Sequence, residues 1–203
     1  REYVSPNGAI MSNTQTAYVL ALQFDLLPNE MRQQAADRLA GNIKLYGNHL
    51  TTGFLGTPYL CNVLTRFGYS DIAYKLLLQE TYPSWLYPVK MGATIIWERW
   101  DGQKPDSTFQ SVGMNSFNHY AYGAIGDWMY RSVAGIEIEM EGYKKSVIRP
   151  TLTDSLNFVS AGTATPYGSI HSGWYRNEGG VEFSIEIPVN TTSTVILPTA
   201  GLS

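Results

Sequence analysis

The chain is organised around residues 83–102, which read PSWLYPVKMGATIIWERWDG. One carboxylate, Glu98, stands between Trp97 and Trp100, and Asp101-Gly102 supplies a tight turn directly after them. Flat aromatic rings suit the C–H faces of a sugar, and a carboxylate beside them can act as an acid, a base or a hydrogen-bond acceptor for hydroxyl groups. The stretch therefore indicates a carbohydrate site in outline. The alternative is an aromatic core with Glu98 as an ordinary surface acid.

Length and charge narrow the class of protein. The 203 residues allow one large domain or two small ones, with enough chain for a hydrophobic core. The net charge of −3 provides no basic field that would attract nucleic acid or anionic lipid. No apolar run approaches the roughly 20 residues that span a bilayer. We therefore expect neither a nucleic-acid partner nor a membrane partner.

Cysteine and histidine usage argues against a bound cofactor. Cys61 is the only cysteine, so no internal disulfide can form. His49, His119 and His171 are not at the spacing of metal ligands, which makes a zinc site improbable. The sequence also has no phosphate-cradling loop and no dinucleotide fingerprint. We expect no metal and no cofactor, and structural roles for His49 and His171.

The first part of the chain has the apolar spacing of helices. Residues 12–27 are apolar nearly all round, 29–46 are amphipathic, 57–67 are largely apolar, and the segment that begins at Ser70 is amphipathic again. Asn29, Thr57 and Ser70 are the predicted N-caps. Alternating buried and amphipathic helices are what two concentric layers of helical hairpins require, as in an (α/α)6 toroid. A plain helical bundle would give the same pattern.

A change of period marks the second part. A short helix over 84–91, a loop over 103–115 and a last helix over 116–133 are predicted first. From Gly135 the period falls to two, because Ile136, Ile138 and Met140 alternate with glutamates. Further strands are predicted near 146–149, 156–163, 168–176, 181–187 and 193–198, with a hairpin connection at 177–180. The fold class is thus mainly α with a C-terminal all-β module, an antiparallel β-sandwich, and the boundary lies near residue 135.

Four runs together resemble one enzyme family. They are TIIWERWDG at 94–102, TTGFLGTPYL at 51–60, SFNHYAYGA at 116–124 and TPYGSIHSGW at 165–174. In order and approximate spacing they are similar to glycoside hydrolase family 78, the bacterial α-L-rhamnosidases, and the resemblance covers nearly the whole chain. It implies that residues 1–134 are the C-terminal half of an (α/α)6 catalytic barrel. It also implies that residues 135–203 are an incomplete β-sandwich domain, short of a strand or two at its end, and that the parent enzyme hydrolyses terminal α-L-rhamnosyl residues.

The resemblance also implies roles for particular side chains. The family is understood to invert configuration, and the glutamate matching Glu98 is understood to be its general base. His119 matches a histidine of the sugar pocket, and Tyr59 belongs to a motif at the barrel mouth. Trp97 and Trp100 either stack on the sugar or wall the pocket. We expect Arg99 to pair with a neighbouring carboxylate.

One part of the family pattern is missing. The general acid of the family lies in an upstream stretch rich in Asp, Arg, Glu and Trp, and this sequence contains no such stretch. We therefore expect a C-terminal fragment that carries the base without the acid and is inactive or nearly inactive alone. We also expect it to self-associate through exposed barrel helices or to be partly disordered. Any export signal would lie outside these residues, and the compartment stays open. Two other interpretations remain: a non-catalytic carbohydrate-binding or structural fragment, and an (α/α)6 glycosidase of different sugar specificity.

Overall fold

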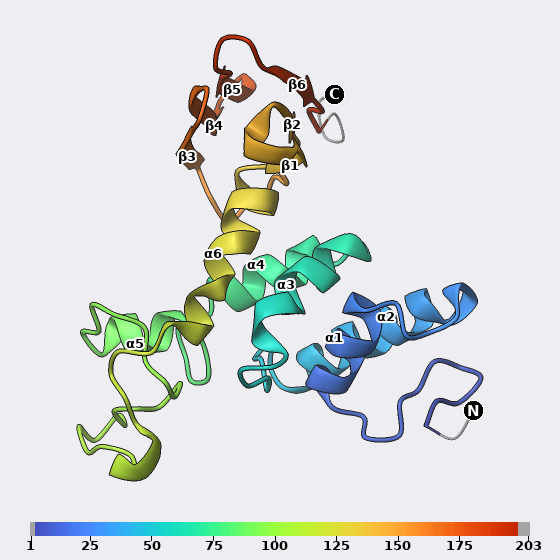
Figure 1. The fold of residues 1–203 in the computed structure, drawn as a ribbon. Coiled ribbons are helices and arrows are strands. Elements are labelled where there is room, and N and C mark those ends of the chain that lie inside the picture. The colour runs from blue at the N-terminus through green and yellow to red at the C-terminus, as the bar shows by residue number, and fades with distance from the viewer. Residues whose placement is uncertain (1–2, 199–203) are drawn as a thin grey trace. The chain divides into compact units, whose positions relative to one another are not determined.

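The structure is a computed structural model that describes residues 3–198. The chain divides into two compact units, Arg1–Ile125 and Gly126–Ser203 (Figure 1). The first unit is helical and the second consists mostly of β-strands, which confirms the predicted order of a helical part and an all-β module. None of the helices in the described part is long and apolar enough to cross a membrane.

The helical unit contains two helical hairpins and shorter pieces. Its helices are α1 (Gln15–Gln23), α2 (Asn29–Leu45), α3 (Thr57–Arg66), α4 (Ser70–Leu77) and α5 (Leu86–Lys90), followed by the short turns η1 (Val112–Met114) and η2 (Tyr120–Ala124). Helix α1 packs against α2 and α3, and α3 packs against α4. The predicted stripe of α2 is buried at Ala35, Leu39 and Ile43. Hairpins of this kind fit a barrel segment and a bundle alike, so the toroid stays a prediction.

The helix ends correct several predictions. Helix α1 is shorter than the predicted 12–27: the hydroxyl of Thr14 accepts from the N–H of Ala17, and Asp25 takes a positive φ of 53° just past the helix. Asn29, Thr57 and Ser70 are not N-caps, because each is itself the first helical residue. The preceding residues cap no N–H group with a side chain.

The predicted last helix begins too early. Residues 116–119 are not helical, and the helical turns start at Tyr120 with η2, continue as α6 (Ile125–Trp128) and end in η3 (Met129–Val133). His119 is extended, with φ −139° and ψ 110°, and caps η2. The reason is a competing partner for the backbone: the N–H of His119 donates to the carbonyl oxygen of Ile96 at 2.9 Å.

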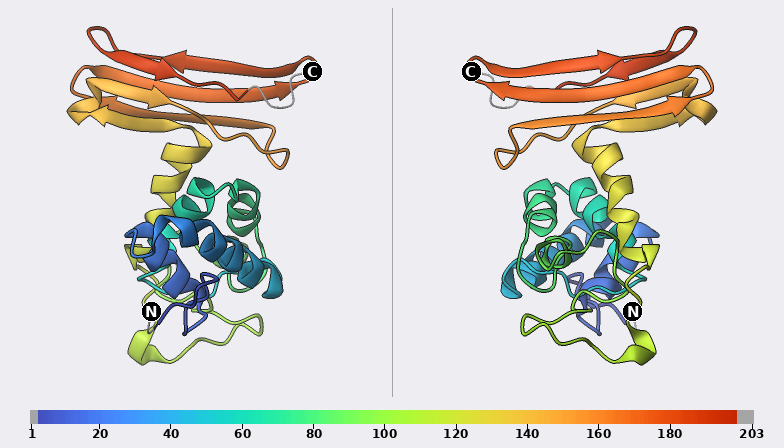
Figure 2. Two further views of the ribbon diagram at one scale, coloured as in Figure 1. Left: turned by 90° about the vertical axis from the view of Figure 1, so that its right-hand side faces the viewer. Right: turned by 90° about the vertical axis from the view of Figure 1, so that its left-hand side faces the viewer.

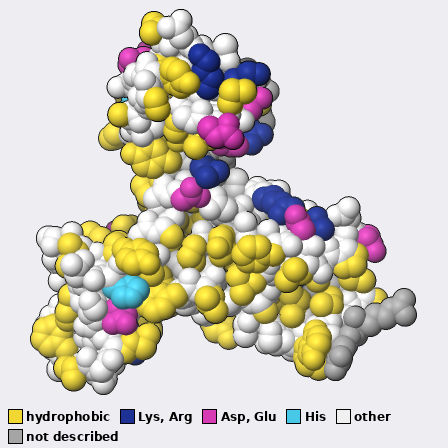
Figure 3. Space-filling model, viewed as in Figure 1, with side chains coloured by type: hydrophobic (Ala, Val, Ile, Leu, Met, Phe, Trp, Pro, Cys, Tyr) yellow, Lys and Arg dark blue, Asp and Glu magenta, His cyan; other side chains and the backbone are white. Residues whose placement is uncertain are grey.

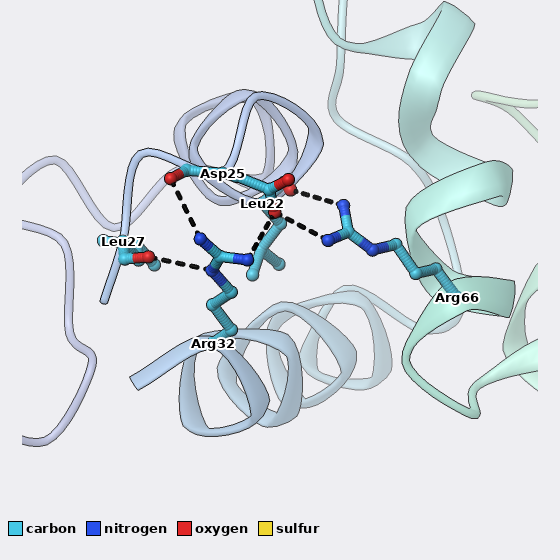
Figure 4. Close-up of polar contacts among 5 residues, drawn as sticks. All are labelled: Leu22, Asp25, Leu27, Arg32 and Arg66. Carbon is cyan, nitrogen blue, oxygen red and sulfur yellow. Dashed lines mark hydrogen bonds and ion pairs between the residues drawn. The ribbon is translucent and has the colours of Figure 1, made fainter. Parts of the chain in front are cut away.

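A charged cluster ties three helices of this unit together (Figure 4). The carboxylate of Asp25 pairs with Arg32 from α2 at 2.8 Å and with Arg66 from α3 at 2.6 Å. Arg66 also donates to the carbonyl oxygen of Leu22 at 3.1 Å, near the end of α1, and Arg32 donates to that of Leu27 at 2.8 Å. The guanidinium groups thus satisfy carbonyl groups at and after the end of α1, and Asp25 offsets part of their positive charge.

The Asp25 cluster predicts a pH-dependent loss of stability. The hydrogen bond from Arg66 and the charge of Arg32 hold the pKa of Asp25 below its ordinary value of 3.8. A lowered folded-state pKa means that the cluster stabilises the fold above about pH 4 and loses this effect as the pH falls through the folded pKa. Asp25→Asn should lower the melting temperature at pH 7 and much less at pH 3. Glu139→Gln, at an exposed carboxylate without a partner in the described residues, should change neither; an equal loss for Asp25→Asn at both pH values would contradict the argument.

The second unit holds two three-stranded sheets (Figure 2). One sheet has the order β1-β2-β6 and the other the order β3-β4-β5. Their core is formed by Ala134, Ile136, Ile148 and Ile170. The strands are β1 (Ile136–Met140), β2 (Lys145–Ile148), β3 (Phe158–Thr165), β4 (Gly168–Asn177), β5 (Gly180–Glu186) and β6 (Thr192–Val195), with a turn η4 (Glu141–Tyr143) after β1.

Two details of this unit differ from the prediction. The sheets are not wholly antiparallel, because β2 and β6 pair in parallel. The alternation of β1 fails after Ile136: Ile138 and Met140 are 50% and 42% exposed. A register irregularity between these two residues breaks the alternation, and β1 lies at the edge of its sheet. The predicted hairpin connection at 177–180 is confirmed, because Asn177 pairs with Gly180.

Hydrophobic side chains are exposed over much of the helical unit (Figure 3). Leu45 is 83% exposed, Leu55 72% and Leu26 71%, and Phe24 and Tyr46 are also more than half exposed. The association that was expected from exposed apolar helix faces stays a prediction.

Candidate active site

Two non-helical segments of the helical unit, one with Glu98 and one with His119, are joined by backbone hydrogen bonds. The N–H of Glu98 donates to the carbonyl oxygen of Ser116 at 2.9 Å, and the N–H of His119 donates to that of Ile96 at 2.9 Å. These bonds pair residues 96–98 with residues 116–119. Two motifs that are 21 positions apart in the sequence therefore form one local structure.

The carboxylate of Glu98 is held at one oxygen only. Its Oε2 accepts a hydrogen bond from the backbone N–H of Ser116 at 2.8 Å. Its Oε1 has no hydrogen-bond partner within residues 3–198, and the side chain is half-buried. One oxygen is thus fixed in direction, and the other can accept from a water molecule or a sugar hydroxyl group.

The imidazole of His119 is positioned by a ring and by a turn. It stacks on Phe54 with 4.8 Å between ring centroids and 8° between planes. Its Nδ1 accepts from the N–H of Ala121 at 3.4 Å. In a neutral imidazole an accepting Nδ1 leaves the proton on Nε2. His119 therefore presents an N–H donor through Nε2.

Trp97 and Trp100 belong to a packed aromatic cluster. Trp97 is 6% exposed and meets Phe117 edge to face at 5.0 Å. Trp100 stacks on Tyr122 with 3.9 Å between ring centroids, and Trp100 and Trp85 meet edge to face with 5.5 Å between centroids. Packing of this kind buries Trp97 in the cluster and covers one ring face of Trp100 with Tyr122, so the choice between stacking on a sugar and walling the pocket stays a prediction.

Tyr59 and Arg99 lie in different surroundings. The ring of Tyr59, on α3, packs edge to face against Phe24 at 5.5 Å, and no contact among the described residues joins it to Glu98 or His119. Arg99 pairs with Asp101 at 3.2 Å, which confirms the predicted ion pair. Gln110 donates to the other oxygen of Asp101 at 2.5 Å. The carboxylate of Asp101 is thus used to hold its own loop.

A small cavity lies beside this segment. It measures about 30 Å³, which is far below the roughly 300–1,000 Å³ of small-molecule sites. Trp85, Trp97, Arg99, Trp100 and Tyr122 are among its lining residues, and Glu98 and His119 are not. The cavity is therefore no sugar pocket.

The side chains of His49 and Cys61 are not available for chemistry at this site. His49 is bonded at both ring nitrogens, to the carbonyl oxygen of Tyr46 at 3.0 Å and to the hydroxyl of Thr81 at 2.8 Å, which confirms its structural role. Burial raises the pKa of the Cys61 thiol well above its ordinary value, so the thiol stays protonated. Within residues 3–198 no three His, Cys, Asp or Glu side chains are grouped as metal ligands.

Sequence reasoning missed three residues that shape the site. Phe54 supports His119, Tyr122 covers one face of Trp100, and the backbone of Ser116 fixes Glu98. Phe54 and Tyr122 stand inside the runs 51–60 and 116–124 that carry the family resemblance. An aromatic residue next to Gly53 in a loop was the available signal for Phe54.

Comparison with known proteins matches both parts of the chain to one enzyme family. Residues 1–133 match the family model of the bacterial alpha-L-rhamnosidase six-hairpin glycosidase domain. Residues 135–202 match that of the bacterial alpha-L-rhamnosidase C-terminal domain. An α-L-rhamnosidase of Streptomyces avermitilis is 46% identical over 196 residues, which are 97% of this chain and 19% of that protein. One of Formosa agariphila is 46% identical over 195 residues, 95% of this chain and 21% of that protein.

Solved structures of α-L-rhamnosidases also match this chain. The crystal structure of the Streptomyces avermitilis α-L-rhamnosidase complexed with L-rhamnose matches this chain with a TM-score of 0.94 at 46% identity. The match covers 98% of this chain and 19% of the Streptomyces chain. The native α-L-rhamnosidase of Aspergillus terreus matches 98% at 38% identity, also with a TM-score of 0.94, over 23% of its chain. This chain thus spans about a fifth of the length of the relatives that it matches.

Proposed function

Because this chain belongs to the family of bacterial α-L-rhamnosidases, we propose that it is the C-terminal part of an inverting α-L-rhamnosidase and that Glu98 is its general base. The observation that carries the proposal is the carboxylate of Glu98, held at Oε2 by the N–H of Ser116 and open at Oε1, with His119 on the neighbouring segment. The substrate class is a glycoside that ends in α-L-rhamnose.

The proposed chemistry assigns each group one task. In an inverting glycosidase a carboxylate removes a proton from a water molecule that attacks the sugar from the face opposite the leaving group. Oε1 of Glu98 takes that proton, while the bond from Ser116 keeps the carboxylate in position. Nε2–H of His119 donates to a sugar hydroxyl group. Trp100 offers its remaining ring face to the sugar, and Trp97 walls the site.

The general acid is proposed to come from the part of the longer relatives that this match does not span. An inverting pair of carboxyl groups stands about 6.5–9.5 Å apart. Asp101 follows Glu98 closely in sequence, but its two oxygens are taken by Arg99 and Gln110. Asp101 is therefore a poor candidate for the acid.

The domain assignment completes the proposal. Residues 1–134 form the C-terminal half of an (α/α)6 barrel and residues 135–203 a β-sandwich domain, as the ranges of the two family models support. Tyr59 would face the mouth of that barrel. The exposed apolar side chains of the helical unit are then the surface through which the remaining barrel helices, or a second copy of the chain, associate.

The test compares this chain alone with a chimera. In the chimera these residues replace the matching fifth of the Streptomyces avermitilis enzyme, which is 46% identical to them. The isolated chain should hydrolyse an alkyl α-L-rhamnoside at least about 10²-fold more slowly than the chimera, because an alkyl leaving group needs a proton and a general acid contributes roughly 10²–10⁴-fold. Rapid turnover by the isolated chain would refute the assignment. An inactive chimera that folds normally would favour a non-catalytic sugar-binding fragment.

His119 gives a separate binding prediction. His119→Ala in the chimera should weaken L-rhamnose binding by about 2- to 10-fold, because one neutral hydrogen bond contributes roughly 0.5–1.5 kcal/mol. Isothermal titration calorimetry measures this. Glu139→Ala, at an exposed residue of β1 in the second unit, is the control and should bind as the parent does. Unchanged binding by His119→Ala would remove His119 from the sugar pocket.

A further inference from the structure

A shallow groove of about 450 Å³ crosses the exposed face of the β3–β4–β5 sheet. This volume falls within the roughly 300–1,000 Å³ of small-molecule sites. The groove lies entirely within the second unit, on the face opposite the side chains of Ile170 and Trp174, which are buried. The side chains on this face are Phe158 and Ser160 of β3, His171 and Tyr175 of β4, and Glu182 and Ser184 of β5.

Two aromatic rings form one end of the groove. Phe158 and Tyr175 pair directly across β3 and β4, and they are 66% and 54% exposed. Residues opposite one another in an antiparallel pair have Cβ atoms about 4.5–5.5 Å apart. Two large apolar rings thus stand side by side on the face of the sheet that does not contribute to the core. Adjacent exposed aromatic rings on a protein surface indicate a site for a ligand or a partner, whereas a single exposed apolar residue does not.

Gly173 forms the floor beside these rings. A Cβ atom there would lie 2.9 Å from the carbonyl oxygen of Val159 and 3.1 Å from the imidazole of His171. The position therefore has no room for a side chain, and the groove keeps its depth. Gly173 pairs with Ser160 on one side and with Ser184 on the other, so hydroxyl groups flank the floor.

Polar groups line the groove around this floor. The hydroxyl of Ser160 and Nε2 of His171 are hydrogen-bonded at 3.0 Å. Glu182 lies opposite Tyr175 on β5 and is exposed. Hydroxyl, imidazole and carboxylate groups next to a stacking surface can donate to and accept from several hydroxyl groups at once.

The charge on this face selects the kind of ligand. The alternation of β5 places Glu182 and Glu186 on it. The three strands place no Lys or Arg there, because Arg176, the one Lys or Arg in these strands, follows the alternation of Trp174 to the opposite face. A phosphate, a uronate or a nucleic acid would be repelled, whereas a neutral ligand rich in hydroxyl groups would not.

We propose that this groove binds a neutral saccharide, as a second sugar site separate from that of Glu98. The sugar ring stacks on Tyr175 and Phe158, and its hydroxyl groups bond to Glu182, Ser184 and the Ser160–His171 pair. Such a site would hold a glycan on the second unit while the terminal sugar is processed elsewhere. It goes beyond the proposed function and does not depend on Glu98.

The test is a two-dimensional NMR titration of the 203-residue chain with rutinose, a neutral disaccharide, and with digalacturonate, an anionic one. Rutinose should shift amide signals of β3, β4 and β5, and digalacturonate should leave them unchanged. Tyr175→Ala should weaken the rutinose effect on these signals by about 5- to 10-fold, since one aromatic contact of this kind is lost. Tyr46→Ala removes a tyrosine of equal exposure, 55% against 54%, and should have no effect.

Further variants keep the proposal falsifiable. Glu182→Ala changes an exposed residue and should also weaken the binding of rutinose, whereas His119→Ala should leave the shifts in β3–β5 intact. Unchanged binding in both Tyr175→Ala and Glu182→Ala would overturn the proposal, as would equal binding of digalacturonate. Sedimentation that shows dimers lost in Tyr175→Ala, without any rutinose shifts, would also overturn it and assign the face to a second copy of the chain.

Discussion

Glu98→Gln in the chimera is expected to lower kcat by about 10²–10⁴-fold, the usual contribution of a general base. Glutamine keeps the size of the side chain, and its amide oxygen can still accept the bond from the N–H of Ser116. It cannot take a proton from water. The change therefore removes the proposed chemistry and leaves the local structure in place, and KM should change little because the sugar contacts remain.

The choice of leaving group separates a base from an acid. A general acid matters most when the leaving oxygen needs a proton, so the loss of an acid is small for an activated aryl rhamnoside. The loss of a base is similar for activated and unactivated leaving groups, since the attacking water is the same. Glu98→Gln should thus reduce kcat for 4-nitrophenyl α-L-rhamnoside and for an alkyl rhamnoside by similar factors. The first product detected by NMR in the parent chimera should be β-L-rhamnose, as inversion requires.

Glu139→Gln is the matched control. Glu139 is an exposed glutamate of β1, so the same chemical change should leave kcat within about twofold, as for a surface substitution far from chemistry. If Glu98→Gln lost activity only on the alkyl rhamnoside, Glu98 would be the acid and the proposed assignment of roles would be reversed. If it kept full activity on both substrates, Glu98 would have no catalytic role.

The sequence predicted the site to the extent that its contacts are local. Glu98 and His119 stand in motifs that could be read directly, and Arg99 and Asp101 are near enough in the chain for their ion pair to be expected. The stacking of Phe54 on His119 joins residues 65 positions apart, and no periodicity reports such a contact. The non-helical backbone at 116–119 was missed for the same reason, because its hydrogen-bond partners are residues 96–98.

For the fold, too, local features could be predicted from the sequence and long-range pairings could not. Strand positions were predicted well because each strand has a period of two and is bounded by turn residues such as those at 177–180. The parallel pairing of β2 with β6 was missed, because the two strands are separated by more than 40 residues and neither sequence specifies its neighbour. Helix starts were displaced by one residue at Asn29, Thr57 and Ser70. A capping side chain can find another partner, and the hydroxyl of Thr57 bonds to that of Thr52 at 2.8 Å.

Gly135→Ala is expected to destabilise the second unit by more than about 4 kcal/mol, a size reached only by a few specific mechanisms. Gly135 is the residue at which the helical period ends, and it has φ of +78°, which costs an L-residue roughly 1–2 kcal/mol. A Cβ there would stand 2.2 Å from the backbone nitrogen of Pro150 and 2.3 Å from the carbonyl carbon of Arg149. Backbone atoms cannot rotate away, so the two segments would have to separate.

That separation would also break hydrogen bonds between the segments. The N–H of Arg149 donates to the carbonyl oxygen of Gly135 at 2.8 Å, and the N–H of Thr151 donates to that of Ser132 at 2.8 Å. These bonds hold the segment before β1 against the segment after β2, next to the core residues Ile136 and Ile148. Loss of this junction should therefore expose the core of the unit, which urea titration followed by amide hydrogen exchange of β1 and β2 would report.

Gly126→Ala is the matched control in the same unit. Its Cβ would meet nothing within 4 Å, and the residue lies inside α6. Alanine is favoured over glycine in a helix by about 0.8–1.0 kcal/mol, so this variant should be as stable as the parent or slightly more so. A Gly135→Ala variant that unfolds within about 1 kcal/mol of Gly126→Ala would mean that the two backbones can move apart cheaply. The close approach at Pro150 would then not be what fixes the start of the β unit.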